Sequence, residues 1–306
     1  MLPKLILIVG PTASGKTGLG IALARKFNGE IINADSRQIY KEMDIATAKP
    51  TRDLDVKKKK TYVVEGIVHH LVGIVKPSQE FTMADFKMRA NEAIADIISR
   101  GKLPIVVGGT GLYIWALVDN LDIPKVAPNK KLREGFEIKT LPELVSLIKK
   151  IDPQTAEKID LKNKRRVLRA LEVAITSGES FSAQTTKSAP IYDCLQIGLN
   201  WPREQLYTNI SNRIDKQLAA GLIEETTALA KRYNWKLPSM SSIGYKQIGA
   251  YLRKEMTLEQ AVEMFKRDTR RYAKRQISWF KRDKRIQWIE NDSLSAATVL
   301  IEDFIL

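Results

Sequence analysis

The sequence predicts an α/β fold, in which a phosphate-loop-type core with a parallel sheet is flanked by helices and carries a small all-helical insertion domain. Short apolar runs alternate with helix-like segments along much of the 306-residue chain, which is the order typical of a parallel sheet. A glycine-rich turn follows the first apolar run, and from about residue 122 to 190 the pattern changes to short, lysine-rich amphipathic helices. We therefore expect a core of residues 1–121 and 191–306, interrupted by a helical insertion of residues 122–190.

The expected core strands are short and apolar. They cover residues 4–9, 30–33, 103–107 and 195–199. A helix over residues 15–27 follows the first strand, and Thr82 with Asp85 forms a capping-box pattern at the start of another helix. Ile210 and Ile214 lie four residues apart, which favours a long helix after the last of these strands.

The turn after the first strand carries a complete phosphate-binding motif, G-x-x-x-x-G-K-[ST]. Its residues are Gly10, Pro11, Thr12, Ala13, Ser14, Gly15, Lys16 and Thr17. Glycines let several backbone N–H groups point at one anion, and the N-terminus of the following helix adds positive potential. Lys16 is placed to reach the far phosphate, and the Thr17 hydroxyl is placed to bind Mg²⁺. We expect a di- or triphosphate here, rather than a glycine turn that binds nothing.

Polar and small residues follow two further strands. Asp35 and Ser36 come directly after residues 30–33, and Gly-Gly-Thr-Gly follows residues 103–107. The carboxyl ends of parallel strands meet at one edge of the sheet, where ligands are held. A motor-type NTPase would carry an acidic residue after the later strand, so this pattern disfavours that class. A small-molecule kinase stays open, because such kinases can also place an aspartate after the second strand to activate a hydroxyl.

Basic residues are in large excess and are concentrated in two places. The chain has 50 Lys and Arg against 35 Asp and Glu, a net charge of +15. Residues 266–285 hold ten basic and two acidic residues, and Arg267, Arg271 and Arg275 fall on one helix face. A second cluster lies at residues 162–169. Two separate clusters suit a clamp around a folded nucleic acid, although a lysine-rich proteome would also make the chain basic.

Cysteine content and hydropathy indicate the cellular compartment. The single cysteine, Cys194, excludes an internal disulfide and a cysteine-rich zinc site, which fits a reducing compartment. A strand begins by residue 5, which leaves no room for a signal peptide, and no apolar run approaches the ~20 residues that span a bilayer. We expect a cytoplasmic protein.

Seven segments together are similar to a known family. They are GPTASGKT (10–17), DSRQIY (35–40), TAKP (47–50), GGTGLY (108–113), RRVLRALEV (165–173), GYKQ (244–247) and TRRYAKRQISWF (269–280). In this order they resemble the tRNA dimethylallyltransferases. The resemblance implies transfer of a dimethylallyl group from dimethylallyl diphosphate to N6 of adenosine 37, beside the tRNA anticodon. It includes the pair His69–His70, which we interpret as structural because neighbours on a strand face opposite sides and make a poor metal site.

The resemblance also implies residue roles. Asp35 would be the general base, Thr12 would contact the reacting centre or the diphosphate, Arg213 would bind the diphosphate, and Mg²⁺ would sit at Thr17. The implied tRNA contacts are Asp35, Ser36, Arg37, Gln38, Thr110, Arg133, Arg165, Arg166, Arg169, Met240, Ser241, Ser242, Ile243, Gly244, Tyr245, Thr269, Arg270, Arg271, Tyr272, Ala273, Lys274, Arg275 and Gln276. We expect a monomer, because one tRNA would fill one clamp.

Three other functions remain as alternatives. A small-molecule or nucleotide kinase would not need the strongly basic segment at residues 266–285. An adenylate isopentenyltransferase, which prenylates free AMP or ADP, would share the core chemistry but would not need two basic clusters and an insertion. A pure RNA-binding module would need neither Lys16 nor Thr17.

Overall fold

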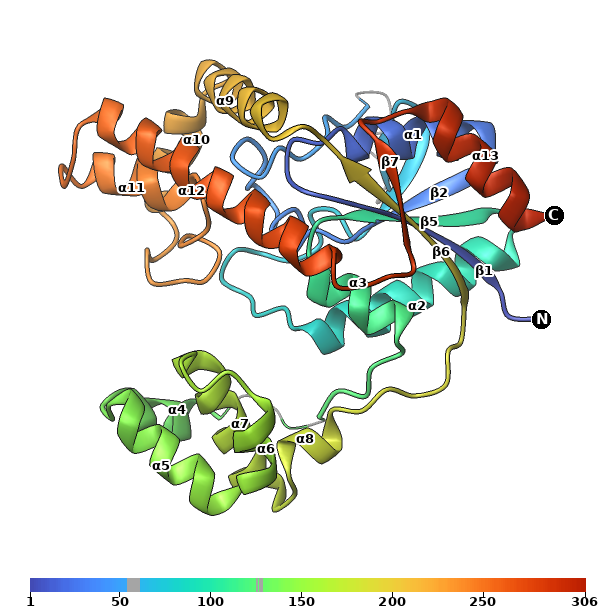
Figure 1. The fold of residues 1–306 in the computed structure, drawn as a ribbon. Coiled ribbons are helices and arrows are strands. Elements are labelled where there is room, and N and C mark those ends of the chain that lie inside the picture. Colours follow the sequence, from blue (N-terminus) through green and yellow to red (C-terminus); the bar gives the residue numbers. More distant parts are fainter. Residues whose placement is uncertain (54–60, 125, 127–128) are drawn as a thin grey trace. The chain divides into compact units, whose positions relative to one another are not determined.

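The computed structural model describes residues 1–53, 61–124, 126 and 129–306, and they form two compact units (Figure 1). The core unit comprises residues Met1–Leu117 and Ile191–Leu306, and the insertion unit comprises Val118–Pro190. The core unit contains a seven-stranded sheet in the order β3-β4-β2-β5-β1-β6-β7. The strands are β1 (Lys4–Val9), β2 (Gly29–Asn33), β3 (Tyr62–Val64), β4 (Ile67–His70), β5 (Leu103–Gly108), β6 (Asp193–Asn200) and β7 (Ile286–Glu290).

The sheet is parallel except for β3, which pairs antiparallel with β4. The central strands are buried on both sides, as expected where helices cover both faces. The predicted α/β class with a parallel sheet is therefore confirmed, and all four strands expected from the sequence are present. The edge strands β3 and β7 and the short strand β4 were not predicted as separate elements.

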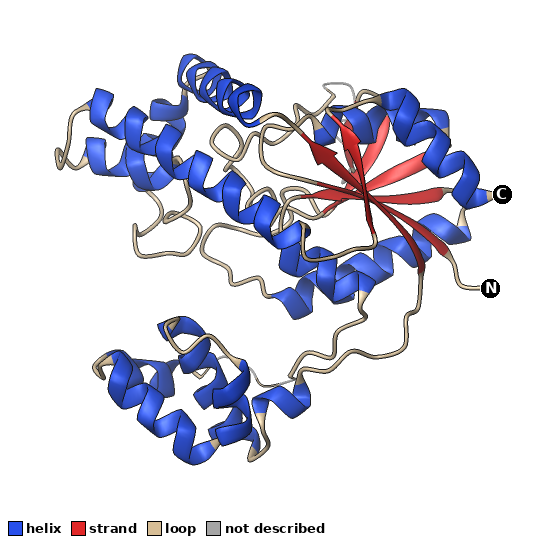
Figure 2. Cartoon of the chain, in the orientation of Figure 1, coloured by secondary structure: helices blue, strands red, loops and turns tan. Residues whose placement is uncertain are grey.

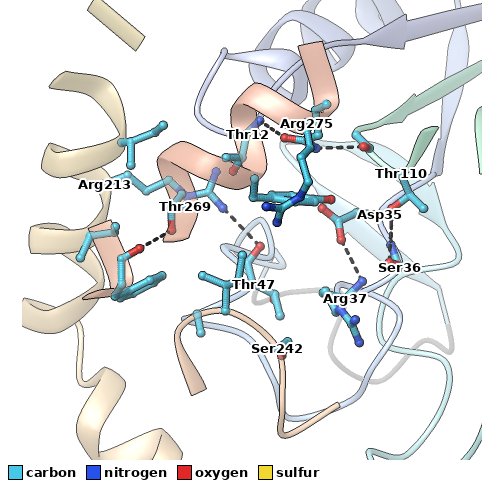
Figure 3. A pocket seen from close by; sticks show the side chains of 18 of the residues that line it. Thr12, Asp35, Ser36, Arg37, Thr47, Thr110, Arg213, Ser242, Thr269 and Arg275 are labelled. Atoms are coloured by element: carbon cyan, nitrogen blue, oxygen red, sulfur yellow. Dashed lines mark hydrogen bonds between the residues drawn. The ribbon is translucent and has the colours of Figure 1, made fainter. Parts of the chain in front are cut away.

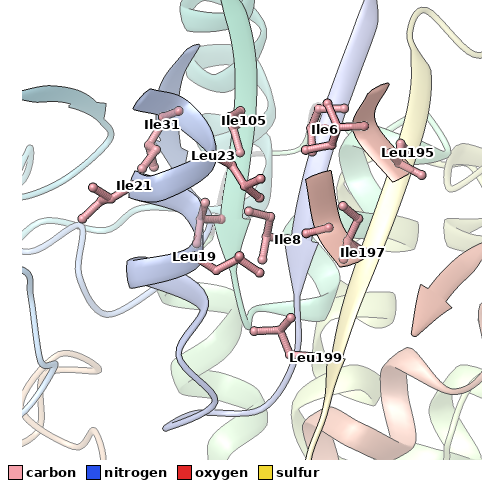
Figure 4. Close-up of a cluster of buried hydrophobic side chains, with 14 of the residues drawn as sticks. Ile6, Ile8, Leu19, Ile21, Leu23, Ile31, Ile105, Leu195, Ile197 and Leu199 are labelled. Atoms are coloured by element: carbon pink, nitrogen blue, oxygen red, sulfur yellow. The ribbon is translucent and has the colours of Figure 1, made fainter. Parts of the chain in front are cut away.

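Helices cover both faces of the sheet (Figure 2). Those of the core unit are α1 (Lys16–Lys26), α2 (Met83–Ser99), α3 (Gly111–Val118), α9 (Arg203–Ala219), α10 (Leu222–Ala230), α11 (Tyr245–Leu252), α12 (Leu258–Phe280) and α13 (Leu294–Ile305). On one face α1 and α13 enclose a core that includes Leu23, Ile8, Ile105 and Ile197 (Figure 4). On the other face Phe86 of α2 stacks on Tyr113 of α3 at 4.0 Å between ring centroids.

Local sequence signals explain where two core helices begin. The capping box expected at α2 is present: the Asp85 N–H donates to Thr82 Oγ1 at 3.2 Å, and the Thr82 N–H donates to Asp85 Oδ2 at 2.8 Å. Thr257 caps α12 in the same way, with Gln260 as its partner. Such caps satisfy N–H groups that have no acceptor within the helix. No described helix has the length and apolar character that crossing a membrane requires.

A second core lies between α9, α10, α11 and α12 and holds a loop over the carboxyl edge of the sheet. Glu225 of α10 accepts hydrogen bonds from the backbone N–H groups of Asp44 and Ile45. The buried hydroxyl of Tyr245 donates to the same carboxylate at 2.5 Å. These bonds fix the segment that leads to Thr47 beside the candidate site.

The regular elements in the described part of the insertion unit are all helices. Its helices are α4 (Lys130–Glu137), α5 (Leu141–Ile151), α6 (Pro153–Lys158), α7 (Lys164–Ser177) and α8 (Phe181–Gln184). Leu144, Ile148, Val167 and Leu171 form a separate apolar core within this unit. An isolated bridge pairs Leu121 with Lys187, where the chain enters and leaves the unit.

Candidate active site

The phosphate loop joins β1 to α1 and leaves polar groups without protein partners. Gly15 lies in the left-handed region at φ 84° and caps α1 without a side chain. The Ser14 side chain is 1% exposed, and its Oγ has no hydrogen-bond partner among the described residues. A buried hydroxyl without a partner is rare, and here it lies at a helix N-terminus. The loop is therefore suited to hold an anion.

Lys16 is half-buried in this loop, and its ammonium makes no ion pair among the described residues. Its Nζ donates to the carbonyl oxygen of Pro11 at 2.5 Å. Burial, reinforced by repulsion from Arg213 and opposed by Asp35, lowers the pKa of Lys16 to about 7. A negatively charged ligand would reverse this by stabilising the ammonium form.

Arg213 of α9 is a second cation at the same place. Its Nη2 donates to the carbonyl oxygen of Thr47 at 3.4 Å, and it forms no ion pair among the described residues (Figure 3). Burial lowers its pKa, and attraction to Asp35 opposes that shift. A bound anion would offset the cost of partly burying such a cation. Lys16 and Arg213 together therefore predict an anionic ligand between them.

Two adjoining cavities open at the carboxyl edge of the sheet. The small cavity, about 70 Å³, is lined by Lys16 and Thr17 among others. The large cavity, about 510 Å³, is lined by residues of the loops after β2 and β5 and of α9 and α12 (Figure 3). Thr12, Asp35 and Arg213 line both cavities. A ligand held by the phosphate loop would therefore adjoin a space large enough for a nucleobase.

Asp35 follows β2 and is held at this junction by bonds to the end of that strand and to the next turn. Its N–H donates to Asn33 Oδ1 at 3.2 Å, and its Oδ1 accepts the N–H of Arg37 at 2.8 Å. Among the described residues only this carboxylate oxygen of Asp35 accepts a hydrogen bond, and the residue is half-buried. Asp35 can therefore present its other oxygen to a ligand in either cavity.

The turn after β5 is brought against the turn after β2 by a glycine. A Cβ on Gly108 would lie 2.2 Å from the carbonyl oxygen of Ala34, so only glycine allows this approach. The Thr110 N–H then reaches the same Ala34 oxygen at 3.2 Å, and Thr110 Oγ1 accepts the N–H of Ser36 at 3.0 Å. The two turns that the sequence placed at one edge are thus hydrogen-bonded to each other.

Gln276 of α12 links the phosphate loop to the turn after β5. Its Oε1 accepts the N–H of Thr12 at 2.8 Å, and its Nε2 donates to the carbonyl oxygen of Gly109 at 2.9 Å. The side chain is 5% exposed and also borders both cavities. Gln276 was expected only as a tRNA contact, and its two bonds show that it also positions Thr12.

The other expected RNA contacts of the core unit fall into three groups. Ser36, Arg37, Thr110, Ser241, Ser242, Ile243, Thr269, Tyr272 and Arg275 line the large cavity. Arg271 and Lys274 are exposed and Arg270 is half-buried on α12, whereas Gln38 lines the small cavity and donates to the carbonyl oxygens of Thr47 and Ala48. Met240, Gly244, Tyr245 and Ala273 are buried. These four pack in the core and support the segments around them, and their contact with tRNA stays a prediction.

The insertion unit holds the remaining expected contacts. Arg133 and Arg169 both bind the fully buried Glu172, at 2.8 and 2.5 Å. Burial favours the neutral acid, but hydrogen bonds from these two arginines and from the Asn129 N–H keep the pKa of Glu172 low. Arg165 and Arg166 are exposed on α7. Arg133 and Arg169 thus stabilise the unit, while Arg165 and Arg166 present charge to solvent.

Several cavity residues were not assigned a role in the site from the sequence. Thr47, Phe265 and Trp279 line the large cavity, and His69 and Asn33 line the small one. Thr47 lies in the motif TAKP and Trp279 in the basic segment, so a signal existed for both. Phe265 had none, because its place depends on how α12 packs.

Fold and site define a phosphate-loop enzyme of the group-transferring class. The IPP transferase family profile matches residues 38–283. The tRNA dimethylallyltransferase of Acetivibrio thermocellus is 43% identical over 310 residues, covering 99% of this chain and 96% of that protein. The tRNA dimethylallyltransferase 2 of Geotalea uraniireducens is 46% identical, covering 94% and 92%. The chain belongs to the IPP transferase family.

Solved structures agree with this assignment. The full-length tRNA isopentenylpyrophosphate transferase of Bacillus halodurans matches with a TM-score of 0.71 and 37% identity, covering 99% of this chain and 95% of that one. A eukaryotic dimethylallyltransferase described as acting on tRNA matches with a TM-score of 0.80 and 30% identity, covering 99% of this chain and 79% of that one.

Proposed function

We propose that this protein transfers the dimethylallyl group of dimethylallyl diphosphate to N6 of adenosine 37 in tRNA, giving N6-(dimethylallyl)adenosine. The observation that carries the proposal is the junction of the two cavities. Lys16 and Arg213 are half-buried there without ion-pair partners among the described residues, and Asp35 lines the same junction. The cations suit a diphosphate, and the carboxylate suits the amine that attacks it.

In this reaction the C–O bond between the allylic carbon and the diphosphate breaks, and a bond from N6 to that carbon forms. Negative charge grows on the departing diphosphate, where Lys16, Arg213 and the loop N–H groups would stabilise it. The proton lost from N6 would pass to Asp35, because the exocyclic amine is a weak nucleophile. Inorganic diphosphate is the second product, and no nucleotide is hydrolysed.

Mg²⁺ fits the donor set of the small cavity. Among the described residues no cluster of three His, Cys, Asp or Glu side chains could hold a metal ion. Mg²⁺ commonly binds through few protein oxygens, substrate phosphates and several waters. The Thr17 hydroxyl lines the small cavity and would be the protein ligand. When bound, the ion would neutralise charge on the diphosphate.

The basic surfaces fit a tRNA substrate. An adenosine must leave its stack to reach Asp35, at a cost of about a few kcal/mol. Phosphate contacts from α12 and from Arg165 and Arg166 would offset that cost. We further propose that the protein acts as a monomer in the cytoplasm. A tRNA substrate and a chain with a single cysteine, Cys194, fit a reducing compartment.

The direct test is incubation of the purified protein with tRNA, dimethylallyl diphosphate and MgCl₂, followed by mass analysis of the nucleosides. We expect N6-(dimethylallyl)adenosine from wild type and none from Lys16→Ala. A tRNA with guanosine at position 37 is the matched control substrate and should stay unmodified. ATP consumption with a metabolite and no RNA product would indicate a kinase, and prenylation of AMP or ADP alone would indicate the adenylate-directed activity.

A further inference from the structure

One imidazole that lines the small cavity has a ring nitrogen without a hydrogen-bond partner among the described residues. His69 lies on β4, opposite Ile31 of β2, and is 4% exposed. It lines the cavity that also contains Lys16 and Thr17. Its neighbour His70 is bound elsewhere, because its Nε2 lies 2.8 Å from Glu30 Oε2. The pair that we interpreted as structural therefore contains one ring bonded to Glu30 and one ring that lines the small cavity.

The protonation of the His69 ring follows from its contacts. Its Nδ1 lies 3.0 Å from the carbonyl oxygen of Ile67, which can only accept, so Nδ1 carries the hydrogen. Burial lowers the pKa of His69, which favours the neutral ring. In a neutral ring protonated at Nδ1, Nε2 is an acceptor. That atom is buried and has no hydrogen-bond partner among the described residues.

The side-chain nitrogen donors that line the cavity are hydrogen-bonded to acceptors other than Nε2. The Lys16 ammonium is directed at Pro11, and the Gln38 amide is directed at Thr47 and Ala48. Lys16 and Arg213 favour the deprotonated form of a bound diphosphate, so its oxygens act as acceptors rather than donors. Water bound to a cation turns its hydrogens outward and is a strong donor. The cavity, at about 70 Å³, has room for such water.

We propose that Nε2 of His69 accepts a hydrogen bond from water in the hydration shell of the Mg²⁺ that accompanies the diphosphate. The proposal rests on the proposed function, since it requires a diphosphate in the phosphate loop. His69 is then a positioning residue: it touches neither metal nor substrate but fixes where the hydrated ion sits beside Thr17. Metal sites commonly depend on such outer contacts.

Calorimetry with inorganic pyrophosphate and increasing MgCl₂ tests this without catalysis. His69→Phe keeps an aromatic ring but removes the acceptor, and should raise the Mg²⁺ concentration for half-maximal pyrophosphate binding by about 10–100-fold. His69→Gln places a carbonyl oxygen near Nε2 and should restore much of the affinity. His70→Gln is the matched control and should leave Mg²⁺ dependence unchanged.

Nitrogen NMR of ¹⁵N-histidine-labelled wild type gives an independent reading. The His69 signals should show hydrogen on Nδ1, and the Nε2 signal should shift with pyrophosphate plus MgCl₂ but not with pyrophosphate alone. If pyrophosphate binding depends on Mg²⁺ and both His69→Phe and the Nε2 signal are unaffected, the inference is overturned and the proposed function stands. If wild type binds no pyrophosphate, both fall. Should His69→Phe not fold, the wild-type Nε2 signal decides.

Discussion

Among single residues, Asp35 is the proposed general base, because one of its carboxylate oxygens is left for a ligand at the cavity junction. Asp35→Ala should lower the single-turnover rate of prenyl transfer by about 10²–10⁴-fold, the usual contribution of a general base. Affinity for tRNA should be nearly intact. Asp96→Ala, which removes an exposed carboxylate paired with Arg100, is the control. Unchanged single-turnover rates in Asp35→Ala would remove it from the role of base.

Lys16 should make diphosphate binding depend on pH. With a pKa of about 7 in the free protein, most of its amine is neutral at pH 8. A bound diphosphate raises that pKa, so binding at pH 8 should take up a proton. The stabilisation from this charge is complete below pH 7 and is lost as pH rises through the pKa of the complex. Calorimetry of pyrophosphate in buffers of different ionisation enthalpy measures the uptake, which Lys16→Met should abolish.

Residue-level prediction succeeded where chemistry is local to a motif. Lys16, Thr17 and Asp35 were found because their neighbours in sequence also position them. The link between Thr12 and Gln276 could not be found, because it joins residues 264 apart through the packing of α12. The place of His69 in the small cavity could not be predicted either, because it depends on the pairing of β4 with β2.

At the scale of elements, α12 combines an apolar face with a basic one. Arg271 and Arg275 are exposed, and Arg275 also lines the large cavity. Replacing both with alanine should weaken tRNA binding and reduce the slope of log affinity against log salt by roughly 1.5–2, if each contacts one phosphate. Arg253→Ala, which removes an arginine already paired with Glu255, is the control. An unchanged slope in the double variant would show that this face contacts no phosphate.

The elements that prediction missed share a physical cause. β3 has three residues, too few to show alternation, and β7 is a short edge strand that follows the charged run at residues 281–285. β7 is stabilised by pairing with β6, from Gln196 opposite Ile286 onward, rather than by its own pattern. The longer core helices were predictable because caps and four-residue spacing are local signals.

At the scale of the whole molecule, the question is whether both units bind one RNA. Arg165→Ala with Arg166→Ala, on α7 of the insertion unit, should weaken tRNA binding several-fold and leave pyrophosphate binding unchanged. Lys149→Ala with Lys150→Ala, exposed on α5, removes the same charge and is the matched control. Equal losses in both double variants would mean that only net charge matters, and the α7 cluster would have no specific role.

The division of the chain was visible in its changing composition, because the lysine-rich segment has helical patterns only. The ion pairs inside the insertion unit could not be predicted, since Arg133 and Glu172 meet only after α4 packs on α7. Basic residues thus look alike in the sequence whether they stabilise a unit or face solvent.

The two hydrogen bonds of Gln276 should couple the binding of RNA to the binding of the prenyl donor. Gln276 belongs to α12, which we expect to contact RNA, and its amide also bonds to the phosphate loop, which we expect to bind the prenyl donor. Binding at one of these places should therefore change the affinity at the other. Equilibrium cooperativity is reciprocal, so RNA and donor should each tighten the other by the same factor, and Gln276→Ala should bring that factor towards one. If dimethylallyl diphosphate binds tightly only when tRNA is bound, less of it is hydrolysed by water.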